Sequence, residues 1–66
     1  MNVGKSIRHF LELNDITQEE LGAAMYVTQQ RISVLCHKNS CGMRTAERLA
    51  KAFGVDVYDF LKAGEE

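Results

Sequence analysis

The amino-acid sequence predicts a compact all-α domain of five short helices. Apolar residues recur three and four positions apart along most of the chain, which is the spacing of one face of a helix. Side chains that cap helix starts stand at Thr17, Thr28 and Asp56, and the chain contains no proline. The 66 residues are close to the smallest size at which one hydrophobic core suffices, so we expect a single domain over residues 1–66.

The first helix is expected over residues 2–13. Its apolar positions follow the i, i+4, i+7, i+8 pattern of one helix face, at Val3, Ile7, Phe10 and Leu11. The helix should end at Asn14-Asp15, where Asn14 can adopt the left-handed conformation that often closes a helix.

The middle of the chain is expected to form two short helices, over about 17–25 and 28–37, joined by a tight turn. Thr17 with Glu20 three residues later is the capping-box pattern of a helix start, and Thr28 begins the next helix in a similar way. The apolar positions at inward spacing are few: Leu21, Ala24, Met25, Ile32 and Leu35. Two helices with so little apolar surface need other helices to close a core.

A polar loop over residues 38–42 separates these helices from two more, over about 43–53 and 57–62. Gly54 should close the fourth helix, and Asp56 should cap the fifth. The inward positions of the fourth helix are expected to be Met43, Ala46, Leu49, Ala50 and Phe53. The alternation of β-branched and aromatic residues after Gly54 also fits a strand, which is the alternative for the last segment.

The charge of the chain is unevenly distributed, although the net charge is only −1. Residues 26–53 carry five basic residues and one acidic residue, whereas acidic residues are in excess over 1–25 and 54–66. A basic middle between acidic ends is what a domain with one phosphate-facing side would show. Ordinary solvated surface charge is the alternative explanation.

Catalytic and metal-binding patterns are missing from the sequence. There is no glycine-rich phosphate loop and no Ser/His/Asp set, and His9 and His37 are isolated. Cys36 and Cys41 are too few for a disulfide framework and lack a fourth ligand at zinc-site spacing. We expect no enzyme activity, metal, cofactor or small-molecule ligand. No apolar run approaches the length of a membrane span and no signal-peptide pattern is present, so we expect a protein of the cytoplasm of a bacterium or a phage-infected cell.

The middle of the chain resembles the helix-turn-helix of the Cro/repressor (XRE-like) family, and the resemblance covers roughly residues 3–62. It is carried by Thr17-Gln18-Glu19-Glu20-Leu21, Val27-Thr28-Gln29-Gln30, Ile32-Ser33 and Leu35, then by Ala50-Lys51-Ala52-Phe53-Gly54-Val55 and Phe60-Leu61. The resemblance implies a five-helix domain of the phage repressor (lambda-repressor-like) type. It also favours a helix over a strand for the last segment, and makes 28–37 the recognition helix.

The resemblance implies a sequence-specific DNA-binding transcriptional regulator, most simply a Cro-like repressor of a phage or prophage. An α-helix fits the DNA major groove, and glutamine can bond adenine through two hydrogen bonds. The expected base contacts are Gln29, Gln30, Arg31, Ser33 and Val34. The expected phosphate or minor-groove contacts are Gln18, Thr28, Lys38, Asn39, Ser40 and Arg44. The alternative is an antirepressor-like module that keeps the fold and binds protein instead of DNA, which the acidic net charge would suit.

The sequence departs from the family pattern in three ways. Tyr26 stands where the family usually has a glycine with positive φ. Either the chain tolerates this conformation, at a cost on the order of 1 kcal/mol, or the turn is slightly different. Gly22 stands where the family prefers alanine, and would allow a closer approach of the two helices. Some family members pair an arginine with a glutamate at the positions of Leu11 and Cys36, so we expect these two side chains to touch in the core.

The segment 55–62 is expected to form a homodimer interface. One recognition helix covers too few base pairs for selective binding, and a two-fold dimer doubles the site. Five apolar or aromatic residues in such a short segment exceed what its helix can bury against its own core. The expected interface residues are Val55, Val57, Tyr58 and Leu61, with Phe60 pointing into the monomer. The alternative is that all five cap the small core.

Overall fold

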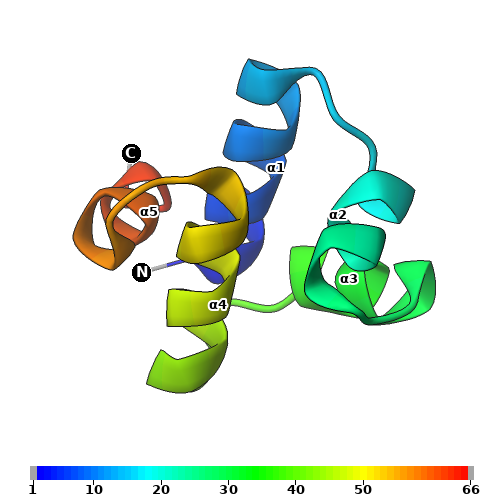
Figure 1. The fold of residues 1–66 in the computed structure, drawn as a ribbon. Helices are drawn as coiled ribbons and strands as arrows, with labels where there is room; N and C mark the ends of the chain where they lie inside the picture. Colours follow the sequence, from blue (N-terminus) through cyan, green and yellow to red (C-terminus); the bar gives the residue numbers. More distant parts are fainter. Residues whose placement is uncertain (1, 66) are drawn as a thin grey trace.

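Helices make up most of residues 2–65, the part of the chain that the computed structural model describes (Figure 1). The five helices in this part are α1 (Val3–Asn14), α2 (Gln18–Met25), α3 (Gln29–Cys36), α4 (Met43–Phe53) and α5 (Val57–Ala63). These bounds lie within one residue of the predicted ones. The strand alternative for the last segment is wrong, because that segment forms α5.

Side-chain caps define four of these helix starts. At α2, Thr17 Oγ1 accepts the Glu20 N–H at 3.1 Å and the Thr17 N–H donates to Glu20 Oε1 at 3.0 Å, so the predicted capping box is present. The side chains of Asn2, Thr28 and Asp56 cap α1, α3 and α5 in the same way, each by accepting one backbone N–H. Each cap satisfies an amide that the helix itself leaves free.

Three helices end on a residue with positive φ. Gly54 closes α4 with φ of 72°, as predicted. α1 ends at Asn14-Asp15 as predicted, but the left-handed residue is Asp15, with φ of 54°, and not Asn14, which remains helical. Asn14 Nδ2 donates instead to the Phe10 carbonyl at 2.8 Å. Tyr26 closes α2 with φ of 59°, so the turn adopts the strained conformation expected for a non-glycine residue there.

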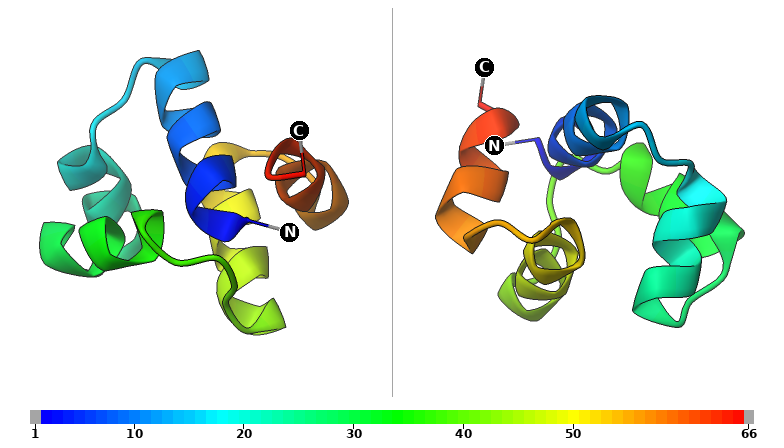
Figure 2. Two further views of the ribbon diagram at one scale, coloured as in Figure 1. Left: turned by 180° about the vertical axis from the view of Figure 1, so that it is seen from behind. Right: turned by 45° about the horizontal axis from the view of Figure 1, so that its top comes forward.

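α1 lies at the centre of the fold and contacts α3, α4 and α5, while α2 packs on α3 and α4 (Figure 2). The core residues are Val3, Ile7, Phe10, Leu11, Leu21, Met25, Ile32, Leu35, Cys36, Leu49, Ala50 and Phe60. Two predicted inward positions are wrong, because Met43 is 58% exposed and Ala24 is also exposed. Gly22 is buried where α2 meets the turn, so the buried face of α2 is rotated relative to the predicted one.

Three phenylalanines fix α5 against α1 and α4. The ring centroids of Phe10 and Phe53 are 5.4 Å apart, those of Phe10 and Phe60 5.9 Å, and those of Phe53 and Phe60 6.1 Å. Offset aromatic packing at these distances adds to the burial of the rings. Phe60 is fully buried, so the prediction that it points into the monomer is confirmed.

The start of α1 fastens the loop that follows α3. The N–H groups of Val3 and Gly4 donate to the carbonyls of Asn39 at 3.1 Å and Lys38 at 2.9 Å. A Cβ at Gly4 would lie 2.7 Å from the Cys36 carbonyl carbon, so glycine permits this approach. Leu11 and Cys36 belong to the same buried core, where α1 packs on α3. Their direct contact stays a prediction.

Candidate nucleic-acid interface

α3 divides into a buried face and a polar outer face. Ile32, Leu35 and Cys36 are buried against the core. Since successive residues turn by about 100° around a helix, Gln30 and Val34 lie opposite this buried side. Of the predicted base contacts, four are exposed and Ser33 is partly buried; the exposed ones are Gln29, Gln30, Arg31 and Val34. The exposed part of α3 therefore carries four of the five residues that the sequence analysis assigned to base contacts.

Val34 is the one apolar residue of this set. It is 53% exposed, on the side of α3 that faces away from the core. A valine at this position gains little from the folding of the isolated chain. Its methyl groups are available to a ligand that lies along the outer face of α3.

Hydrogen bonds and a close backbone approach join α3 to α2. The Val27 N–H donates to the Gly22 carbonyl at 2.9 Å, and a Cβ at Gly22 would lie 2.9 Å from the Val27 oxygen. Gly22 thus allows the end of α2 to approach the turn closely, as the sequence suggested. From α4, Arg48 Nη2 donates to the Met25 carbonyl at 2.9 Å, which satisfies a carbonyl at the end of α2. The sequence analysis missed this role of Arg48.

Two predicted phosphate contacts lie at the starts of the motif's helices. Thr28 Oγ1 accepts the Arg31 N–H at 3.2 Å, which leaves the hydroxyl proton of Thr28 free to donate to an anion. Gln18 is the first residue of α2 and is partly buried. The neighbouring Glu20 is engaged in the capping box, so its carboxylate is directed at the Thr17 amide.

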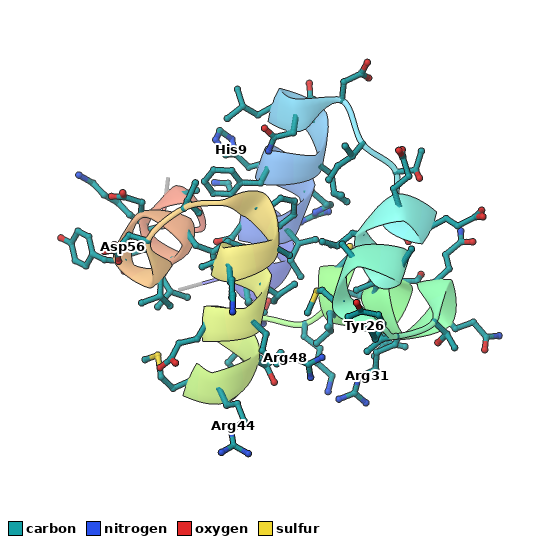
Figure 3. The ribbon with its side chains drawn as sticks, viewed as in Figure 1. His9, Tyr26, Arg31, Arg44, Arg48 and Asp56 are labelled. Carbon is teal, nitrogen blue, oxygen red and sulfur yellow. The ribbon has the colours of Figure 1, made fainter. Side chains whose placement is uncertain are left out.

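The remaining predicted contacts follow α3 along the chain. Lys38, Asn39 and Ser40 are exposed, and the carbonyls of Lys38 and Asn39 are fixed by the start of α1. Arg44 is exposed in the first turn of α4. Figure 3 shows Arg31 and Arg44 pointing to the same side of the molecule, although they come from different helices. The fold thus directs cationic side chains of α3 and α4 to one side.

The predicted dimer segment is only partly exposed. Val55, Val57 and Leu61 are each partly buried, and Tyr58 is 70% exposed. A shallow groove between α4 and α5 is lined by Glu47, Ala50, Lys51, Gly54, Val55, Asp56 and Val57. The structure therefore brings Val55 and Val57 to one groove, which does not include Tyr58 or Leu61.

Cys36 and Cys41 do not belong to a cluster of metal-binding side chains in the described part of the chain. No group of three His, Cys, Asp or Glu side chains that could hold a metal ion comes together within residues 2–65. Burial raises the pKa of the Cys36 thiol, with an opposing influence of Arg8, and burial also raises the pKa of Cys41 against the opposing charge of Lys38. Both thiols are free in the structure.

Within residues 2–65, no helix is long and apolar enough to cross a membrane.

Comparison with known proteins gives one match. A family model described as Helix-turn-helix (HTH_3) matches residues 7–60, which covers most of the chain and all three helices that build the outer face and its junction. No curated protein and no solved structure matches the chain.

Proposed function

This chain belongs to the Cro/repressor-type (XRE-like) helix-turn-helix family of DNA-binding transcriptional regulators, and we propose that it is a Cro-like repressor of a phage or prophage. In this proposal the chain forms one DNA-binding domain that occupies an operator as a dimer and so excludes polymerase. The observation that carries the proposal is the outer face of α3, which presents polar side chains opposite a buried apolar side. A helix of this kind fits the major groove.

In the proposed complex, the start of α3 reads base edges. Gln29 and Gln30 bond adenine through its N6 and N7 positions, and Arg31 donates to an acceptor edge such as that of guanine. Ser33 lies within reach of either kind of edge, and the exposed Val34 contacts a thymine methyl group. Support comes from the exposure of this face and from the hydrogen-bonded junction with α2, because a reading helix must be held in a fixed orientation.

The phosphate contacts fix the position of α3 in the groove. They are assigned to Gln18, Thr28, Lys38, Asn39 and Ser40, with Arg44 at the minor groove. The free hydroxyl proton of Thr28 and the exposure of the 38–40 loop support these roles. Phosphate contacts carry no sequence information, so their loss should weaken binding to all duplexes to a similar degree.

The dimer is assigned to the segment 55–62, with Val55, Val57, Tyr58 and Leu61 at the interface. An exposed tyrosine beside partly buried aliphatic residues supports this assignment. Two copies related by a two-fold axis would place their recognition helices about 34 Å apart, one turn of duplex.

Selection of bound duplexes from a random pool, followed by sequencing, would identify the preferred operator. On that operator, replacing Gln29 and Gln30 together by alanine should cost about 1–3 kcal/mol of binding free energy for each base that is no longer hydrogen-bonded. Gln18→Ala is the matched control, because it should weaken binding to selected and shuffled duplexes equally. A double variant that binds the operator as well as the parent would refute the assigned readers.

The dimer has its own test. Sedimentation of the chain with and without the selected duplex should give two chains per operator at saturation, and Leu61→Glu should reduce this stoichiometry. One chain per operator, unchanged by Leu61→Glu, would rule the dimer out.

A protein-interaction module without DNA binding is the second candidate, and the net charge of −1 is the observation that favours it. The two candidates differ in their response to salt. Binding to duplex DNA should weaken as salt rises, because phosphate contacts release counterions. A protein-interaction module that does not bind DNA should enrich no duplex in the selection.

A further inference from the structure

A second surface, away from the outer face of α3, has the features of a docking site. It is a groove between the end of α2 and the side of α4, lined by Ala24, Met25, Tyr26, Arg48, Lys51 and Ala52. Apolar atoms form most of its lining, and two cations lie along its α4 side. Neither the DNA contacts nor the dimer segment proposed above uses this groove.

Tyr26 is the exposed aromatic side chain of the groove. It is 96% exposed and stands on the turn before α3, with φ of 59°. The left-handed conformation disfavours residues with a Cβ, and an exposed ring gains no packing in return within the chain. Tyrosine is enriched among the residues that dominate protein interfaces, because it offers a large apolar ring together with a hydroxyl. The position of this ring therefore points to a ligand outside the chain.

The charge of the groove is positive. Arg48 and Lys51 both line it, and they share one face of α4 with Arg44, since these positions are spaced by four and three residues. Arg48 uses Nη2 to hold the Met25 carbonyl and keeps its other donors. The nearest acidic residue along α4, Glu47, lines the separate groove between α4 and α5. A ligand for this groove should carry negative charge.

In Figure 3 the labelled Tyr26 and Arg48, which line the groove, lie nearer the middle of the molecule than Arg31 and Arg44. α4 begins at the side to which Arg31 and Arg44 point and runs away from it (Figure 1). Because a helix rises about 1.5 Å per residue, Lys51 lies roughly 10 Å further along α4 than Arg44. A duplex seated on the outer face of α3 and at Arg44 is therefore not expected to fill the Lys51 end of the groove, although Tyr26 stands only two residues before Thr28.

We propose that this groove docks an acidic segment of a partner protein. An apolar side chain of the segment inserts between Tyr26 and α4, over Ala24 and Ala52, and its carboxylates contact Arg48 and Lys51. The distance from the outer face of α3 favours a protein segment over DNA as the source of the negative charge. Only the choice of a protein segment over DNA rests on the function proposed above. The geometry of the groove is independent of that function.

The test is a selection of short random peptides displayed against the full chain, without DNA. Synthetic copies of the enriched peptides are then titrated into the chain while backbone amide chemical shifts are recorded. Enriched peptides should be acidic with an apolar anchor, and the shifts should concentrate at residues 24–26 and 48–52. Peptides that are not acidic, a selection that enriches none, or shifts that map elsewhere would overturn the proposal.

Three variants sharpen the test. Tyr26→Gly removes the ring at a position that suits glycine, and Lys51→Glu reverses one charge of the groove; each should weaken peptide binding by at least about tenfold. Lys5→Glu, at an exposed lysine of α1 outside the proposed interfaces, is the matched control and should leave the affinity unchanged. Equal effects of Lys51→Glu and Lys5→Glu would show a general charge effect and would refute the docking site.

Two further results would assign the groove to another ligand and overturn the proposal. Displacement of the peptide by the selected duplex would mean that the cations of the groove serve DNA. Shifts at the groove amides that grow with chain concentration in the absence of peptide would mean that a second copy occupies it. Because the peptide titration needs no DNA, its failure is distinguishable from a failure of the proposed function.

Discussion

Tyr26→Gly should stabilise the protein. Tyr26 has φ of 59° at the end of α2, in the region that L residues other than glycine avoid. Its side chain is 96% exposed, so deleting it removes almost no buried apolar contact. The substitution therefore changes the cost of the backbone conformation and little else.

The magnitude follows from the two opposing effects of glycine. The left-handed conformation costs an L residue roughly 1–2 kcal/mol. A glycine at this position also makes the unfolded chain more flexible, which lowers the free energy of unfolding by about 0.5–1 kcal/mol. We expect a net gain of about 1 kcal/mol in the free energy of unfolding, which corresponds to a rise in Tm of roughly 4–8 °C for a domain of this size.

Urea unfolding of the parent, Tyr26→Gly and Tyr26→Ala gives the comparison. Tyr26→Ala also deletes the ring but keeps a Cβ in the left-handed conformation, so its stability should stay within about 0.5 kcal/mol of the parent. The denaturant slopes of the three proteins should agree, so that their midpoints report stability alone. If glycine were no more stabilising than alanine, the reasoning about strain in this turn would be refuted.

Gly22→Ala should destabilise the protein by about 1–3 kcal/mol in urea unfolding, because the new Cβ would lie 2.9 Å from the Val27 oxygen. A variant as stable as the parent would contradict this close approach. Phe60→Ala should leave the chain largely unfolded by circular dichroism, since the loss of about 3–5 kcal/mol is comparable to the whole stability of a small domain; a folded variant with the parent's Tm would exclude α5 from the core. In alkylation followed by mass spectrometry, the partly buried Cys41 should react before the buried Cys36. Both thiols should react faster as the pH rises, because only the thiolate attacks and burial raises the pKa of each thiol. Reaction of Cys36 in the folded protein as fast as a free thiol would show that the end of α3 is open.

The local features of the fold could be predicted from the sequence because neighbouring residues determine them. The capping box at Thr17 and Glu20 joins positions three apart, and the cap at Thr28 does the same. The left-handed end at Gly54 follows from the lack of a Cβ. Together with the family resemblance, which favoured a helix over a strand after Gly54, these signals predicted the bounds of the helices described in residues 2–65 to within one residue.

Features that depend on distant contacts were missed. Met43 has the spacing of an inward residue, but at the start of α4 its side chain is 58% exposed and lies outside the core. The bond from Arg48 to the Met25 carbonyl joins residues 23 apart in the sequence, and no local pattern reveals it. Gly4 reads as an ordinary helix residue until the Cys36 carbonyl is found beside it. The spacing of apolar residues predicts which face of a helix is buried, whereas tertiary packing decides how far along the helix that buried face extends.

The candidate site was predictable to a similar degree. The positions of Gln29, Gln30 and Val34 on the outer face of α3 follow from helix geometry once Ile32 and Leu35 are placed in the core. Which bases these side chains contact depends on the DNA, so the assigned contacts stay predictions.

The central claim is that the outer face of α3 reads a DNA sequence. The most direct measurement is a fluorescence anisotropy titration of the selected duplex and of a shuffled duplex of the same composition, each at two salt concentrations. The chain should bind the selected duplex at least about 10³-fold more tightly, and both affinities should fall as salt rises, because phosphate contacts contribute to both complexes. Equal affinity for the two duplexes, or an affinity that does not respond to salt, would contradict the claim.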